Sequence, residues 1–386
     1  MEKMDFLTTD ESRFTPDFND MLKIIILNSL GFFFIGFLVP IIARLDMNAS
    51  AFEISLLIAS QVLGRTISGA ITGVITDKVR SKSRLILIGS LGRAISYFMI
   101  YFAIYLNSIT FLGIGIFTLG FMAGVFWVPF NTLIAEKSNK DNRSQAYGKR
   151  NSYNAIGQVI GTILGFTLAG IFLSTSNGLL IYISFPIYGI ANIFAGIIFY
   201  KRVDENIIFE EIDANLKNNN SEDEIKEKKP RNWSLLIGIG FLMFVLFLSN
   251  INSNIAKPFL NIYIIENIEP NIILAMLAYL PAGIIATLFA PKLGEIVDKV
   301  HPFIQNLLSR ISRLYRGKAL GMGDFFMFLG SFVGPIFGGI TWDLFGPKFP
   351  FILSIFVELS LIPFYALVVY LLLPNLAEKY EDKKST

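Results

Sequence analysis

The sequence predicts an all-α membrane protein, and three observations lead to that expectation. Of its 386 residues, 53% are hydrophobic and only 16% are charged, whereas soluble domains carry about 25% charged residues. The apolar residues form continuous stretches of the length that a membrane-spanning helix needs, about 20 residues each. The basic residues gather in a few of the connections between these stretches. A chain with so few charged residues cannot cover a water-facing surface with polar groups. The apolar surface must therefore face lipid.

Ten apolar stretches are predicted to be transmembrane helices, because none shows the alternating polarity of a bilayer-spanning strand. The stretches cover about 23–45, 51–76, 85–106, 108–135, 152–174 and 178–200, then 233–256, 270–291, 324–345 and 349–374. The first follows a polar segment and is too long for a cleavable signal peptide. We therefore expect a six-helix half over 1–200, a cytoplasmic linker over 201–232, and a half with about four helices and a tail over 233–386.

The placement of Lys and Arg predicts the orientation, because cytoplasmic loops carry an excess of both. The loops at the other helix ends hold only Arg44, Lys257 and Lys348. By contrast, the stretches 76–84, 136–150, 201–231 and 292–318 hold four, five, seven and six basic residues. This bias predicts a multi-pass protein of the plasma membrane with both termini in the cytoplasm.

Composition also excludes several classes of function. The chain has no Cys and a single His, His301, which excludes disulfides, thiolate metal sites and a cysteine nucleophile. It shows no Gly-rich phosphate loop, cluster of metal ligands or nucleophile–base set. We expect no enzyme, no metal, no cofactor and no nucleic-acid partner, with membrane lipids around the chain.

Two parts of the chain recur further along it. Gly73, Ile75, Asp77, Lys78 and Val79 are repeated at an offset of 221 residues, as Gly294, Ile296, Asp298, Lys299 and Val300. A second set holds an offset of 173 residues: Pro129, Phe130, Arg143, Ala146, Gly148, Gly157, Gly161 and Gly165 recur as Pro302, Phe303, Arg316, Ala319, Gly321, Gly330, Gly334 and Gly338. The offsets differ by 48 residues, the length of two helices. The second half is therefore a copy of the first without the counterparts of its third and fourth helices.

With this motif and this repeat, the chain resembles the major facilitator superfamily of transporters, usually two six-helix halves related by a parallel repeat. The resemblance covers roughly Met21–Pro374, and its marker is Gly73, Asp77 and Lys78, followed by further basic residues. Arg80 and Ser81 depart from the signature, which has Gly and a basic residue there. The resemblance implies an MFS-like bundle that moves a small polar solute by alternating access.

Asp77 is expected to belong to a conformational gate. A carboxylate at a helix end among basic residues can accept hydrogen bonds from a neighbouring helix N-terminus, whose dipole favours negative charge. In the resembled family this Asp engages the cytoplasmic start of the penultimate helix, here near Arg316–Asp324. The alternative is that Asp77 only balances its basic loop. The basic neighbours are Lys78, Lys82 and Arg84.

The repeat extends the gate to the second half. Asp298, with Gly294 and Lys299, would face the start of the fifth helix near Arg143–Asn154.

Small residues at helical spacing have a different expected role, because they allow the close approach of membrane helices. We expect such packing faces at Gly157, Gly161 and Gly165, and at Gly330, Gly334, Pro335 and Gly338.

Polar side chains within the spans are the candidates for a solute site, because ionisable groups inside a bilayer are costly and usually functional. Arg65 and Arg93 would present guanidinium groups to an anionic or polyhydroxylated solute, or pair with carbonyls and polar neighbours, or snorkel. The amides would bind a polar solute or bond between helices. The candidate set is Asn28, Gln61, Arg65, Arg93, Trp127, Asn131, Asn154, Gln158, Asn250 and Asn254.

Two questions stay open in the sequence. Glu358, deep in the last span, is the candidate for proton coupling, although a hydrogen bond to a neighbouring helix would also account for it. Facilitated transport or another coupling ion fits the sequence equally well.

The missing helix pair leaves a seam that lipid, a rearranged helix or a second protomer would fill. The competing hypothesis is therefore an inactive remnant or internally deleted carrier that acts at most as a membrane interaction protein.

Overall fold

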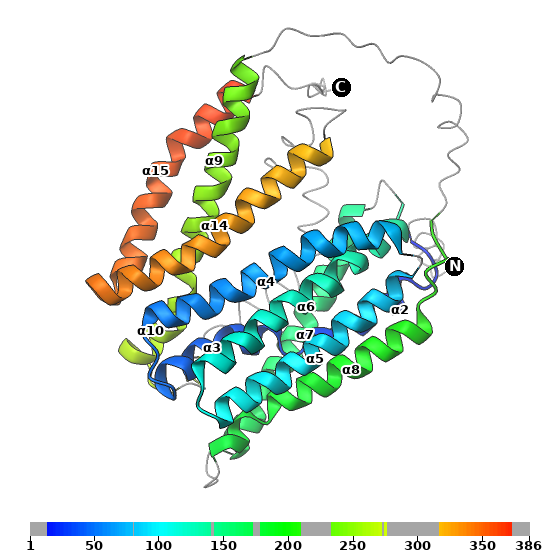
Figure 1. Cartoon of the computed structure of the whole chain (residues 1–386), viewed down its shortest axis with the longest axis horizontal. Coiled ribbons are helices and arrows are strands. Elements are labelled where there is room, and N and C mark those ends of the chain that lie inside the picture. Colours follow the sequence, from blue (N-terminus) through cyan, green and yellow to red (C-terminus); the bar gives the residue numbers. More distant parts are fainter. Residues whose placement is uncertain are drawn as a thin grey trace, which may run out of the picture.

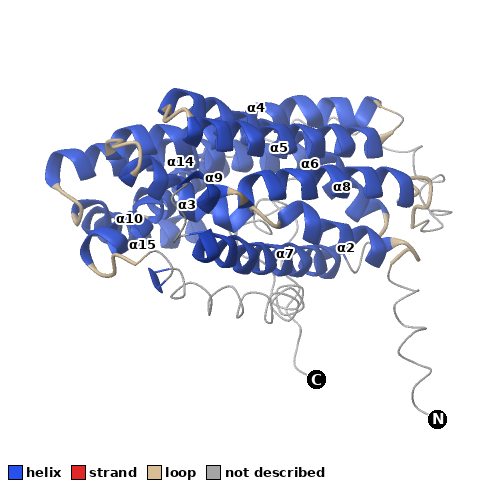
Figure 2. Cartoon of the chain, turned by 90° about the horizontal axis from the view of Figure 1, so that it is seen from below, coloured by secondary structure: helices blue, strands red, loops and turns tan. Residues whose placement is uncertain are grey.

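The computed structural model describes residues 14–79, 81–139, 143–172, 178–209, 233–271, 274–275 and 316–372. In these ranges the chain is helical, apart from turns, loops and an isolated bridge between Phe14 and Ser138 (Figure 2). Eight of the described helices are long and apolar enough to cross a membrane. The prediction of an all-α membrane protein is confirmed. Most of the predicted span 270–291 and the repeated segment Gly294–Val300 lie outside the described residues.

The first half consists of seven described α-helices, because its first span is broken into two. The break lies at Leu30 and Gly31, where a Cβ on Gly31 would lie 2.5 Å from the Tyr97 hydroxyl oxygen. The elements are α2 (Phe18–Ser29), α3 (Phe32–Leu45), α4 (Ala51–Lys78), α5 (Lys82–Tyr105), α6 (Ile109–Glu136), α7 (Arg143–Phe172), the 3₁₀ turn η2 (Gly178–Tyr182) and α8 (Ser184–Arg202).

The described part of the second half contains one more broken span and two long helices. Its elements are α9 (Trp233–Ile255), the 3₁₀ turn η3 (Lys257–Phe259), α10 (Leu260–Asn267), α14 (Arg316–Phe345) and α15 (Phe349–Leu372). Pro258 lies in η3, where its ring fits a short turn and its missing N–H interrupts the helix. Helix α9 packs against both α14 and α15.

The two halves meet at one end of the molecule. There α4 packs against α14, and α10 packs against α3. We call this the closed end; it carries the loops 46–50, 106–108 and 346–348. We call the other end the basic end, because α4 finishes there at Lys78 and α8 at Arg202. Figure 1 shows α9 and α14 diverging from α4 toward the basic end.

The apolar cores follow the same division. One core at the closed end includes residues of both halves, among them Ile54 of α4 and Trp342 of α14. Two further cores lie toward the basic end: one inside the first half around Phe130, and one between α9 and α15 around Leu246 and Leu361. Within the described residues, the buried apolar core that joins the halves is thus at the closed end.

Glycines bring helix backbones together within each half. A Cβ at Gly157 of α7 would lie 2.5 Å from the Ile26 carbonyl oxygen, and one at Gly161 would overlap the carbonyl oxygen of Leu30. Gly334 of α14 lies equally close to the Ile251 carbonyl oxygen of α9. Gly330 and Gly338 lie in the same way against the carbonyls of Phe247 and Ile255. Such contact replaces side-chain volume by backbone contact between the helices.

We expect Gly161→Ala to lower the stability of the first half, because the new methyl group would occupy the space of the Leu30 carbonyl oxygen. Overpacking of this kind costs about 1 to 3 kcal/mol. The matched control is Gly69→Ala in α4, where the added Cβ has no heavy atom within 4 Å. Thermal unfolding in detergent measures both variants. An equal midpoint for Gly161→Ala and the wild type would contradict the packing.

Candidate functional site

The N-terminus of α4 is capped by the opposite half of the molecule. Asp343, in the last turn of α14, accepts hydrogen bonds from the backbone N–H groups of Ala51 at 3.1 Å and Phe52 at 2.9 Å. These N–H groups have no acceptor inside their own helix, and the helix dipole favours a carboxylate there. Ser50 and Glu53 complete the end with a reciprocal capping box. Asp343 thus binds one half to the other by charge-assisted hydrogen bonds.

An ion pair and a close helix contact accompany this cap at the closed end. The Arg44 Nε atom lies 2.7 Å from a carboxylate oxygen of Glu266, and its Nη1 donates to the Ala49 carbonyl at 3.1 Å. The two charged side chains are 31% and 26% exposed, so the pair contributes at most about 1 kcal/mol. Gly339 of α14 lies against the Ala51 carbonyl, which brings the two backbones together.

The described gate residues, all of the first half, lie toward the basic end, away from these interhalf bonds. Lys78 and Arg84 are exposed, and Lys82 pairs with Glu136 of the same half at 2.5 Å. Outside its own stretch of helix, a Cβ placed on Gly73 would meet no heavy atom of the described residues within 4 Å. The side chain of Asp77 lies outside the described part of the structure, as do Gly294, Asp298 and Lys299.

Asn28 and Arg93 form a polar cluster inside the first half. Arg93 is completely buried; its Nη1 donates to the Asn28 side-chain oxygen and its Nη2 to the Asn28 carbonyl at 2.9 Å. Asn28 donates in turn to Ser90 at 3.0 Å and to Asn192 at 3.1 Å. The guanidinium also lies 4.7 Å above the ring of Phe32. Of the roles considered for Arg93, the structure thus shows pairing with a carbonyl and a polar neighbour rather than snorkelling to the surface.

A second group of polar residues lies nearer the surface of the first half. Arg150 of α7 donates from Nη1 to the side-chain oxygen of Asn131 at 3.0 Å, and its guanidinium lies 5.2 Å from the centre of the Trp127 ring. Arg65 of α4 is exposed and lies near enough to Arg150 for electrostatic repulsion between the two. Sequence reasoning missed Arg150, because it follows a basic loop and reads as part of that loop.

The remaining first-half candidates are partly buried. The backbone of Gln61 lies against Gly120 of α6, and the Gln158 carbonyl accepts from Thr162 one turn later at 2.6 Å. The Asn154 side-chain oxygen is buried without a hydrogen bond to another described residue.

The second-half candidates bond between helices. Ser331 of α14 bridges Asn250 and Asn254 of α9 at 3.3 and 3.4 Å. Glu358, exposed on α15, accepts a hydrogen bond from the Asn252 side chain of α9 at 2.5 Å. These amides therefore contribute to the contacts of α9 with α14 and α15.

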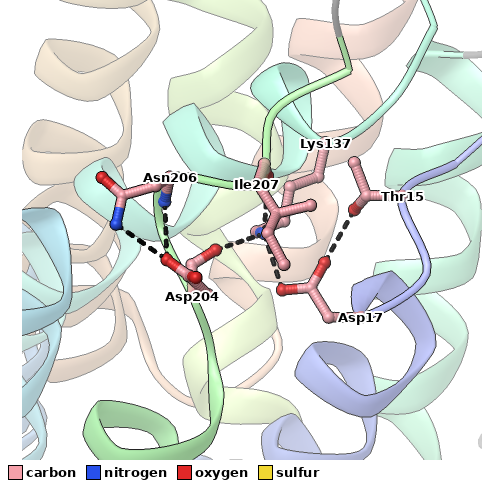
Figure 3. Close-up of polar contacts among 6 residues, drawn as sticks. All are labelled: Thr15, Asp17, Lys137, Asp204, Asn206 and Ile207. Carbon is pink, nitrogen blue, oxygen red and sulfur yellow. Dashed lines mark hydrogen bonds and ion pairs between the residues drawn. The ribbon is translucent and has the colours of Figure 1, made fainter.

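Lys137, at the end of α6, forms a buried polar network that the sequence did not reveal. Its side chain is completely buried, and Nζ donates to Asp17 and to the carbonyls of Asp204 and Ile207, at 2.7, 2.7 and 2.8 Å (Figure 3). Hydrogen bonds from Asn206, first from its backbone N–H, lower the pKa of the Asp204 carboxyl. The network fastens the segments before α2 and after α8 to the end of α6.

The chain matches the Major Facilitator Superfamily over residues 22–312, and it belongs to this superfamily. It is therefore a multi-pass membrane protein whose family function is the transport of a solute across the membrane. No curated relative matches the chain.

Solved transporter structures share the fold at low identity. A solved structure that gives insights into substrate recognition in proton dependent oligopeptide transporters has a TM-score of 0.64 and 11% identity, with 92% of this chain and 98% of that chain covered. A mutant of the nucleoside transporter NupG gives 0.60 and 13%, with 90% and 99% covered. An inward-facing, unoccupied bacterial homologue of the human lysosomal transporter Spinster gives 0.54 and 13%, with 94% and 82% covered.

We expect Lys137→Met to loosen the segments 14–17 and 203–209, because it leaves the Asp17 carboxylate and two carbonyls without their donor. Removing one partner of a buried pair costs about 3 to 5 kcal/mol. The measurement is hydrogen–deuterium exchange by mass spectrometry on the purified protein. Lys201→Met, at an exposed position on α8, is the matched control. Unchanged exchange in both segments would contradict the role of Lys137.

Proposed function

We propose that the protein is a secondary carrier that moves a small polar solute across the plasma membrane by alternating access of its two halves. The basic end and both termini lie on the cytoplasmic side, as the excess of Lys and Arg at that end favours. The observation that supports this most strongly is the apolar core shared by both halves at the closed end, with separate cores toward the basic end. This conformation would then be the inward-open one, because the described parts of the halves share a core at the closed end and have separate cores toward the cytoplasmic end.

The opposite conformation requires the bonds at the closed end to break. Asp343 must leave the N–H groups of Ala51 and Phe52, each of which makes a charge-assisted hydrogen bond worth about 1.5 to 3 kcal/mol. New contacts at the basic end must offset this loss, because the states of a working carrier differ by only a few kcal/mol. Asp77 is our proposed acceptor there, facing the start of α14, with Lys78, Lys82 and Arg84 around it. Asp298, with Gly294 and Lys299, would serve the same purpose at the start of α7.

The energy source of transport is either a proton gradient, the gradient of another ion, or the solute gradient alone. Proton coupling through Glu358 would require that residue to exchange its hydrogen bond with Asn252 for a proton during the cycle. Uptake into proteoliposomes would then respond to an imposed pH gradient, and Glu358→Gln would remove the response. Facilitated transport predicts equal uptake with and without the gradient, and another coupling ion predicts a response to that ion's gradient.

The second candidate function is a membrane interaction protein without transport, and the 48-residue difference between the repeat offsets favours it. In that case the seam of the second half would bind lipid or a second copy of the chain. Proteoliposome uptake of sugars, amino acids, organic anions and drugs separates the two candidates. Saturable flux of any one solute supports the carrier, and no saturable flux across the panel contradicts it.

We expect a cross-link across the closed end to stop transport, because the halves must separate there. The chain has no cysteine, so the pair Arg44→Cys with Glu266→Cys can be joined by a short, reducible bifunctional maleimide. Uptake should fall to background and return after reduction. The control pair, Asp46→Cys with Tyr182→Cys, joins neighbours within the first half at the same end and should leave uptake intact. Full uptake by the cross-linked Arg44–Glu266 pair would refute alternating access.

We also expect Asp343→Asn to populate the state in which the closed end is open, because a neutral amide caps the α4 dipole more weakly than a carboxylate. The reporter is Ser55→Cys, which is completely buried beside Gly339. Its labelling by a water-soluble maleimide should speed up by about tenfold, the effect of one lost charge-assisted hydrogen bond. The control is Asp46→Asn, which removes a carboxylate that lies within the first half. Equal rates in all three proteins would exclude Asp343 as the lock.

A further inference from the structure

Arg65 is a charged side chain at the depth of the membrane that has no partner among the described residues. No hydrogen bond or ion pair joins its guanidinium to another described residue, although it lies in the middle of the spanning helix Ala51–Thr76. Ionisable groups at such depth normally pair with one another or with carbonyls, as Arg93 does with Asn28. Arg65 instead stays exposed, on the helix of the first half that packs against α14.

Other arginines near Arg65 add to the positive charge around it. Arg150 and the buried Arg93 both lie within electrostatic reach of Arg65. Arg150 is held in place by the ring of Trp127 and the side-chain oxygen of Asn131, and neither group neutralises its charge. The first half thus presents one guanidinium that is already oriented, that of Arg150, and within its electrostatic reach a second, that of Arg65, which has no described partner.

The acidic side chains of the described spanning helices do not neutralise this charge. Within the spanning segments, each one apart from Asp324 is engaged elsewhere: Glu53 at Ser50, Glu136 with Lys82, Glu266 with Arg44, Asp343 at α4 and Glu358 with Asn252. Asp77 lies past the end of the α4 span, and its side chain is outside the described part of the structure. Asp324 has no described partner and lies on α14, in the opposite half. Asp324 and Arg65 are both about 15 to 22 Å along their helices from the contact of Gly339 with Ala51 and Ser55, at 1.5 Å per residue.

We propose that Arg65, with Arg150 beside it, binds the anionic group of the transported solute, and that the solute is a small organic anion carrying a carboxylate or a phosphate. This inference rests on the proposed carrier function. A guanidinium offers two parallel donors that match the two oxygens of either group. In the proposed inward-open conformation the anion would reach the exposed Arg65 from the cytoplasm. When the basic end closes, Asp324, which lies at a similar distance from the closed end, would move toward Arg65 and displace the anion from it.

Binding is measured as the thermal stabilisation of the purified full-length protein in detergent, at constant ionic strength. The probes are lactate, succinate, glutamate, gluconate, inorganic phosphate and glucose 6-phosphate, with glycerol and glucose as uncharged matches. We expect at least one anion to raise the unfolding midpoint with saturable dependence, while glycerol and glucose leave it unchanged. Whether a carboxylate or a phosphate ester binds more tightly identifies the class. Stabilisation by an uncharged probe alone, or by none of the anions, overturns the inference.

Variants locate the site. Arg65→Gln should weaken binding of the stabilising anion by about tenfold to a hundredfold, as expected for a lost charge-assisted contact, and Arg65→Lys should restore part of it. Arg150→Gln should weaken it as well. Arg202→Gln, at an exposed position on the basic end of α8, is the matched control and should bind normally. Normal binding by Arg65→Gln overturns the inference, as does equal weakening by Arg202→Gln.

Asp324→Asn separates anion binding from an ion pair between the halves. If Arg65 serves only to pair with Asp324, both Arg65→Gln and Asp324→Asn leave anion affinity unchanged, which overturns the inference. Uptake assays keep the two proposals apart. Flux of an uncharged solute that is insensitive to Arg65→Gln would leave the carrier function standing and overturn the anion site. Arg65-dependent anion binding without flux of any solute would support the site and contradict the carrier.

Discussion

The hydrogen bonds from the N-terminus of α4 to Asp343 of α14 are the interaction on which the observed arrangement of the halves depends. A helix must find acceptors for its first N–H groups, and α4 obtains two of them from the other half of the molecule. The remaining capping comes from Ser50 and Glu53, within four residues of the same end. The helix end is therefore fully capped only while the halves touch, which couples a local requirement of one helix to the conformation of the whole protein.

The apolar core at the closed end reinforces this polar contact. Ile54 and Trp342, from opposite halves, belong to one buried cluster, whose burial stabilises the contact without restricting its direction. The Asp343 carboxylate fixes how α14 is positioned against α4, because it must reach the N–H groups at the start of α4. Gly339 lets the two helix backbones approach closely enough for both contacts. Away from this region the described part of each half has its own core, so each half can move as a unit when the contact at the closed end breaks.

Much of the fold could be predicted from the sequence because the bilayer imposes it. Apolar length and helix-terminal signals are local, so the helices from 51 to 136 lie within a few residues of the predicted stretches, and Ser50 begins α4 as a capping box. The break after Ser29 was not foreseen, because it depends on tertiary contact. The predicted span 233–256 ends where α9 ends, but the continuation of the chain through η3 into α10 was not foreseen. Whether the second half lacks two helices stays a prediction, since 276–315 lies outside the described residues.

The candidate site was less accessible to sequence reasoning, because side-chain direction depends on tertiary packing. Asn28 and Arg93 were singled out by polarity within apolar spans, and the structure assigns them to each other inside the first half. Arg150 lies two turns into α7 and Lys137 directly follows α6, both close to other basic residues in the sequence, so nothing in their spacing separated them from solvated charges. Their distinguishing features are burial and partners: a Trp ring for the first, and an Asp with two carbonyls for the second.

The most direct test of alternating access is to measure both ends of the molecule in one preparation. Because the chain has no cysteine, one spin-label pair can be placed at Leu45 and Lys348 across the closed end, and another at Lys78 and Met322 across the basic end. Double electron–electron resonance in nanodiscs, with and without a transported solute, gives both distance distributions. We predict that every population with a shorter basic-end distance has a matching population with a longer closed-end distance. A closed-end distance that stays fixed while the basic-end distance changes would contradict the account.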